Sequence, residues 1–146
     1  MSWFNWYGLI AVVVILIPNI IISIVDKQAF ENKFEGKAVI ISEQIGRYGC
    51  MAFMVFNVPY TYFGFWFDNA LTVYLAVGGA LLFIYILGWI IFRKGRSLFK
   101  MLWLSVTPSV LFLFCGAIVS SVPLIVFAVI FSVGHITVSV KNADKK

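Results

Sequence analysis

The sequence predicts an all-α integral membrane protein: a bundle of five transmembrane helices with the N-terminus outside and the C-terminus in the cytoplasm. Apolar residues make up 62 % of the 146 residues and charged residues 12 %, against about 45–50 % and about 25 % in soluble domains. The apolar residues gather in long runs, and the basic residues fall between alternate runs. A soluble domain of this size could not hide so much apolar surface, because small domains bury only about two-thirds of what the unfolded chain exposes.

Five apolar runs are long enough to cross a hydrocarbon core roughly 30 Å thick, which takes about 17–25 helical residues. In order, they are residues 3–25, 47–67, 71–92, 101–119 and 124–140. The last two cannot form one helix, because it would be about 60 Å long at about 1.5 Å per residue. Residues 120–123 supply a turn, with Pro123 suited to the first turn of the next helix. Because 124–140 is short, the alternative is four spans plus a short re-entrant or interfacial segment. Residues 1–146 form a single transmembrane domain in both cases.

The basic residues give the orientation. All 11 of them lie in three segments: Lys27, Lys33, Lys37 and Arg47; then Arg93, Lys94, Arg96 and Lys100; then Lys141, Lys145 and Lys146. Cytoplasmic connections of membrane proteins carry an excess of Lys and Arg, so we expect these segments in the cytoplasm. There they face anionic headgroups, so membrane lipids are the expected partners and nucleic acid is not.

The segment of residues 27–46, before the second span, has its own pattern. Apolar residues recur at helical spacing while charged residues face elsewhere: Phe30, Phe34, Ala38, Ile41 and Ile45 against Glu31, Lys33, Glu35 and Lys37. This pattern predicts an amphipathic helix that lies in the cytoplasmic interface and runs into the second span. The alternative is a solvated loop.

Polar residues inside the spans are the candidate functional residues, because hydrocarbon offers no water to satisfy them. Most fall in stripes of small or polar residues that a compact bundle explains by close helix packing. Asn57 stands at the centre of the second span, where its amide needs a partner on another helix or on a ligand. Glu43 and Arg47 are four residues apart in the order that favours a helical ion pair.

Several polar residues share one depth near the cytoplasmic side. His135 lies six residues before Lys141, hence about 9 Å inside the boundary. Asn19 follows the helix-bending Pro18, and three hydroxyl residues surround Pro108. We therefore predict a polar pocket that opens toward the cytoplasm. Its candidate ligand-binding residues are Asn19, Glu43, Arg47, Ser105, Thr107, Ser109 and His135, with Asn57 as a further ligand contact.

The residue types exclude several kinds of chemistry. One histidine and two separated cysteines do not supply the converging ligands of a metal site, so neither a metal nor another cofactor is expected. No paired carboxylates, Walker loop or GxSxG string occurs in the spans, so no catalytic residue is assigned.

Three strings carry a resemblance: residues 17–19 (IPN), 43–49 (EQIGRYG) and 108–113 (PSVLFL). With them, most of the chain resembles small uncharacterised polytopic membrane proteins of Gram-positive bacteria. The resemblance implies a bacterial plasma membrane and no particular activity.

Together these observations predict a non-enzymatic membrane protein. We expect it to bind a small amphiphilic or anionic ligand, or a partner helix, in the cytoplasmic half of the bundle. The alternative is an oligomeric transporter or channel for a small molecule, because five short helices enclose little pore alone. A lipid-modifying membrane enzyme is a more distant alternative. A homo-oligomer or a larger membrane complex is compatible with each of them.

Overall fold

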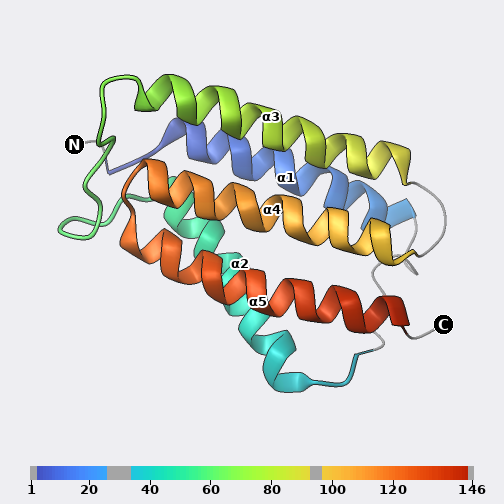
Figure 1. The fold of residues 1–146 in the computed structure, drawn as a ribbon. Helices are drawn as coiled ribbons and strands as arrows, with labels where there is room; N and C mark the ends of the chain where they lie inside the picture. Colours follow the sequence, from blue (N-terminus) through green and yellow to red (C-terminus); the bar gives the residue numbers. More distant parts are fainter. Residues whose placement is uncertain (1–2, 26–33, 93–96, 145–146) are drawn as a thin grey trace.

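The computed structural model describes residues 3–25, 34–92 and 97–144. In this part of the chain five helices pack into one bundle (Figure 1), which confirms the predicted all-α class. They are α1 (Trp6–Val25), α2 (Lys37–Val55), α3 (Ala70–Ile91), α4 (Leu98–Ile118) and α5 (Val122–Asp144). By length and composition, α1, α3, α4 and α5 can each cross a membrane.

The last helix is longer than predicted. Helix α5 has 23 residues and continues past Val140 through Lys141 and Asn142. Lys141 lies in the last turn, where the helix dipole favours a basic residue. The helix can therefore continue past the end of the apolar run. The short last segment that suggested a re-entrant or interfacial piece is therefore a full-length helix. Of the five described helices, α2 is the one that does not have the length and composition of a membrane span.

Helix α2 is the main correction to the predicted elements. The second span was predicted over 47–67, but the helix begins ten residues earlier, at Lys37, and ends at Val55. Phe56 takes an extended conformation, and Pro59 follows three residues later. The residue before a proline avoids the helical region, which explains why the helix does not continue through the apolar run. Of the predicted amphipathic segment, residues 27–33 lie outside the described residues, and 37–46 form the first half of α2.

Residues 56–69 close one end of the bundle without forming a helix. Phe56 pairs with Phe4 ahead of α1, and Tyr62 pairs with Ser121 at the turn between α4 and α5. The backbone N–H of Asn57 donates to the carbonyl of Trp3 at 2.9 Å. These backbone pairs satisfy polar groups that a helix would otherwise satisfy internally.

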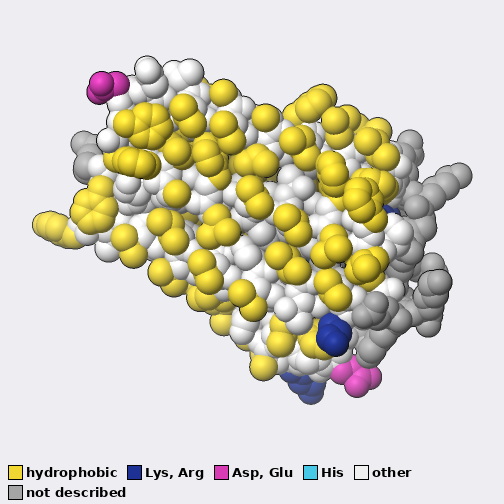
Figure 2. Space-filling model, viewed as in Figure 1, with side chains coloured by type: hydrophobic (Ala, Val, Ile, Leu, Met, Phe, Trp, Pro, Cys, Tyr) yellow, Lys and Arg dark blue, Asp and Glu magenta, His cyan; other side chains and the backbone are white. Residues whose placement is uncertain are grey.

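The helices alternate in direction, so α1 begins at one end of the bundle and α5 ends at the other (Figure 1). The most extensive contact is between α2 and α5, followed by those of α4 with α5 and of α3 with α4, while α1 contacts α2 and α3. Figure 2 shows hydrophobic side chains over the middle of the visible face and charged side chains toward its ends. An apolar belt with charged ends suits a protein whose surroundings are lipid.

The contact between α2 and α5 depends on glycine. A Cβ atom on Gly46 would lie 2.5 Å from the backbone nitrogen of Phe131, and a Cβ atom on Gly134 would lie 3.0 Å from the Cα atom of Glu43. Because the neighbours are backbone atoms, no side-chain rotation can relieve the contact. Small residues at such positions let membrane helices approach closely.

We predict that Gly46→Ala destabilises the bundle by about 1–3 kcal/mol, the usual cost of overpacking. The matched control is Gly79→Ala on α3, where a Cβ atom would have nothing within 4 Å. That substitution should be neutral or stabilising by about 0.5–1 kcal/mol, because alanine is the better helix former. Unfolding in mixed detergent micelles measures both variants. Equal stability of the two variants would contradict the close packing of α2 on α5.

Candidate functional site

A cavity of about 280 Å³ lies among all five helices. Its lining residues lie toward the end of the bundle where α1 and α3 finish and α4 begins, and Figure 1 shows that end of the bundle. Its polar lining includes Asn19, Glu43, Arg47, Tyr85, His135 and Ser139. Its apolar lining includes Ile15, Met51, Trp89, Pro108, Phe112 and Phe131. Mostly apolar walls with a few polar groups are typical of small-molecule pockets.

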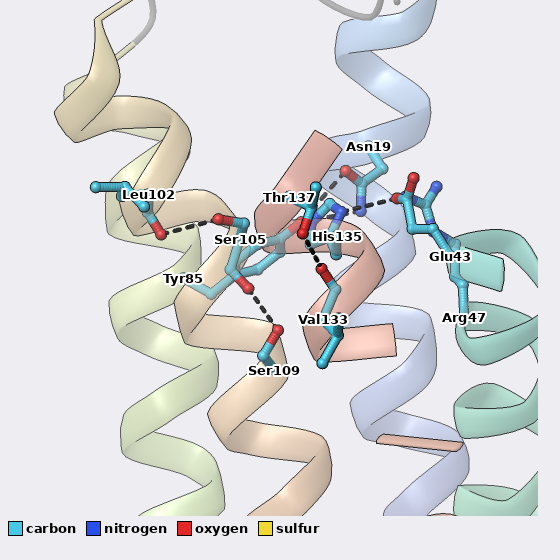
Figure 3. A network of polar contacts seen from close by, with 10 residues as sticks. All are labelled: Asn19, Glu43, Arg47, Tyr85, Leu102, Ser105, Ser109, Val133, His135 and Thr137. Atoms are coloured by element: carbon cyan, nitrogen blue, oxygen red, sulfur yellow. Dashed lines mark hydrogen bonds and ion pairs between the residues drawn. The ribbon is translucent and has the colours of Figure 1, made fainter. Parts of the chain in front are cut away.

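Glu43 is the centre of the polar lining. It is only 3 % exposed although it stands near the start of α2. Its Oε1 atom accepts a hydrogen bond from the Arg47 guanidinium, one turn along the same helix. The Nδ1 atom of His135 on α5 lies 2.8 Å from the same oxygen. Figure 3 shows Glu43 and His135 turned toward each other from their two helices, with Arg47 beside them.

The fold places this cluster by helix packing. Gly134 directly precedes His135, and the absence of a side chain there brings α5 against the backbone of Glu43. The imidazole of His135 stacks on the Phe131 ring with centroids 4.7 Å apart. The predicted ion pair between Glu43 and Arg47 is confirmed, but it is not a surface pair. A pair with a buried acid depends on its hydrogen bonds, because the carboxylate has lost its water.

Asn19 is held by a second polar contact. Its Nδ2 atom donates to the Ile15 carbonyl at 2.8 Å and to the Tyr85 hydroxyl at 2.9 Å. The Tyr85 hydroxyl also lies 3.2 Å from the Asn19 Oδ1 atom. This contact ties α1 to α3 beside the cavity. Tyr85 is not among the pocket residues predicted from the sequence. Its hydroxyl within an apolar run, eight residues before Arg93, was the signal that could have identified it.

Three predicted pocket residues on α4 do not line the cavity. The hydroxyl of Ser105 donates to Leu102 at 3.2 Å, that of Thr107 to Trp103 at 2.7 Å, and that of Ser109 to Ser105 at 2.7 Å. Figure 3 shows two of these bonds running along the helix. Each hydroxyl is satisfied by a carbonyl of its own helix, so agreement in depth did not place them in the pocket.

Asn57 also lies apart from the cavity. The sequence placed it at the middle of a membrane helix, but it follows the end of α2, in the segment that pairs with Trp3. That segment lies at one end of the bundle (Figure 1), and the residues that line the cavity lie toward the other end. Its predicted place at the centre of a helix is therefore wrong. The predicted residues that the fold does bring together are Asn19, Glu43, Arg47 and His135.

In the described ranges, no three His, Cys, Asp or Glu side chains converge as metal ligands would. Glu43 and His135 supply two such groups, and their mutual contact occupies one oxygen and one nitrogen. The arrangement is instead suited to hydrogen bonding and to charge recognition. Comparisons with family models, with curated protein sequences and with solved structures give no match for this chain.

We predict that Glu43→Ala lowers the stability of the bundle by about 2–4 kcal/mol, because Arg47 and His135 lose their shared acceptor. Glu35→Ala is the matched control, since Glu35 is exposed and lies just before the same helix. Its effect should stay within about 0.5 kcal/mol, as for most surface substitutions. Thermal unfolding in detergent compares the two, and a Glu43→Ala protein as stable as the control would contradict the role of the buried cluster.

Proposed function

We propose that this chain is a multi-pass protein of a bacterial plasma membrane in which α2 is the fifth transmembrane helix. Helix α2 has 19 residues and is therefore about 28 Å long, close to the thickness of a hydrocarbon core. Ile41 and Ile45 are 58 % and 53 % exposed on the outside of the bundle, whereas Glu43 is buried within it. A helix with its apolar side outward and its acid inward is suited to lipid and not to water.

Five crossings put the two termini on opposite sides of the membrane. We propose that the N-terminus is outside and the C-terminus is cytoplasmic, because the positive-inside bias assigns the basic segments to the cytoplasm. The cavity is near the end of the bundle where α5 finishes with Lys141 in its last turn. On this orientation the cavity opens in the cytoplasmic half of the membrane.

We infer that the protein is a non-enzymatic binder of a small anionic amphiphile. The observation that carries this proposal is the apolar cavity with the Glu43–Arg47–His135 cluster in its wall. A guanidinium has five N–H donors, so Arg47 can hold Glu43 and still bind an anionic group. Its side chain is 33 % exposed, which leaves the guanidinium accessible to a ligand. The apolar walls would hold the nonpolar part of the same molecule.

The proposed orientation predicts which residues a membrane-impermeant maleimide reaches in intact bacterial cells. Asp68→Cys should be labelled from outside, and Lys141→Cys only after the membrane is permeabilised. Both positions are exposed, and the native Cys50 and Cys115 are buried, so their background should be low. The opposite labelling pattern, or labelling of both positions from outside, would contradict five crossings in this orientation.

The binding proposal predicts that phosphatidylglycerol, an anionic lipid, stabilises the detergent-solubilised protein more than the zwitterionic phosphatidylcholine does. A ligand at a hundredfold excess over its Kd adds about 2.7 kcal/mol to the stability of the folded state. Arg47→Ala should lose most of this effect, and Arg47→Lys should keep part of it because it retains the charge.

The matched control is Lys141→Ala, which removes an exposed cation away from the cluster and should leave the lipid effect unchanged. Thermal unfolding measured against lipid concentration gives the comparison. If Arg47→Ala and Lys141→Ala lose the stabilisation by phosphatidylglycerol equally, the lipid is attracted to basic residues in general. That result would contradict binding in the cavity.

A further inference from the structure

The Glu43–Arg47 pair fixes which nitrogen of His135 carries its hydrogen. Arg47 is always protonated, and its contact with Oε1 makes that atom of Glu43 a hydrogen-bond acceptor. The Nδ1 atom of His135 lies 2.8 Å from the same Oε1. In a neutral imidazole Nδ1 must then be the donor, and the other nitrogen, Nε2, has the free lone pair.

The ring is also held in place. Phe131 stacks on the imidazole with an interplanar angle of 20°. Phe112 packs edge-on against Phe131, with the two ring centroids 5.5 Å apart. The side chain of His135 is 21 % exposed and forms part of the cavity wall. The contact with Glu43 and the stacking on Phe131 hold the ring in one position in the cavity wall, and the tautomer leaves Nε2 as a hydrogen-bond acceptor.

We propose that His135 determines the specificity of the cavity by accepting, through Nε2, a hydrogen bond from a hydroxyl of the bound molecule. This inference rests on the proposed binding of an anionic amphiphile and narrows its chemical class. Arg47 takes the anionic group and His135 takes a hydroxyl on the same headgroup. Phosphatidylglycerol has both features, because its phosphodiester carries a glycerol.

The size of the cavity agrees with a headgroup. Its volume of about 280 Å³ is near the lower end of the range for small-molecule pockets, about 300–1,000 Å³. A whole lipid does not fit, so the acyl chains would remain among the lipids beside the bundle. The apolar lining would then contact the glycerol and ester region, which is less polar than the phosphate.

The tautomer can be measured on the unmodified chain, because His135 is the only histidine. Protein labelled with ¹⁵N-histidine should show, at alkaline pH, a protonated Nδ1 and an unprotonated Nε2. Free neutral histidine prefers the opposite tautomer, so this result would reflect the Glu43 contact. In Glu43→Gln the preference for the Nδ1–H tautomer should weaken or reverse. A native protein with its proton on Nε2 would overturn the inference.

Binding of two lipids in nanodiscs tests whether His135 recognises a hydroxyl of the lipid headgroup. Phosphatidylmethanol has the same anionic phosphodiester as phosphatidylglycerol but no headgroup hydroxyl. The native protein should bind phosphatidylglycerol about fivefold to tenfold more tightly, the usual worth of one hydrogen bond. His135→Phe should bind the two lipids equally. The matched control Thr137→Ala, at a partly exposed residue of the same helix that does not line the cavity, should keep the preference.

The outcomes separate this inference from the proposed function. If the native protein binds both anionic lipids equally and more tightly than phosphatidylcholine, the role of His135 is overturned while anion binding by the cavity stands. If it binds neither better than phosphatidylcholine, the proposed function fails as well. Free glycerol phosphate is the remaining probe: if it binds as tightly as the lipid, the ligand is a soluble phosphate ester and the amphiphile assignment is wrong. The tautomer measurement on the native protein does not depend on the folding of any variant.

Discussion

The contact between α2 and α5 is the constraint on which the polar interior depends. Gly46 and Gly134 let the two backbones approach until only glycine fits between them. Because the two backbones are so close, the imidazole of His135 on α5 reaches the carboxylate of Glu43 on α2 directly. A wider spacing would leave a carboxylate in the apolar interior with Arg47 as its partner, and burying such a group without enough hydrogen bonds costs several kcal/mol. The packing and the polar cluster therefore support each other.

The proposed placement of α2 in the membrane gives a physical reason for its inverted arrangement. In a soluble protein, Ile41 and Ile45 would face the core and Glu43 would face water. Here the isoleucines are exposed and the acid is buried, which is the arrangement expected when the surrounding solvent is hydrocarbon. The sequence predicted an amphipathic helix over residues 27–46, with its apolar side in the membrane interface; α2 begins at Lys37, and Ile41 and Ile45 of the predicted apolar side are exposed. The charged residues that make α2 look unlike a membrane helix are the ones that build the site.

The sequence predicted the candidate site in part, and the successes and failures have separate physical causes. Glu43 and Arg47 lie four residues apart, so helical geometry alone was enough to pair them. His135 and Asn19 were selected because polar groups in hydrocarbon need partners. Ser105, Thr107 and Ser109 met the same criterion, but a hydroxyl can be satisfied by a carbonyl of its own helix, and theirs are. The amide of Asn19 has more hydrogen-bonding groups than one such carbonyl satisfies, and it also bonds to Tyr85 on another helix.

The sequence by itself determined the all-helical class, the surrounding solvent and the approximate position of four apolar helices, because each follows from composition and from runs of local residues. The tertiary structure decided where α2 begins and, together with Pro59, where it ends. The apolar run after Val55 is long enough to continue a helix, but it pairs instead with Trp3 and Phe4, which are distant in the sequence. The tertiary structure also decided that Glu43 meets His135, since a contact across 92 residues depends on how two helices pack and leaves no local pattern.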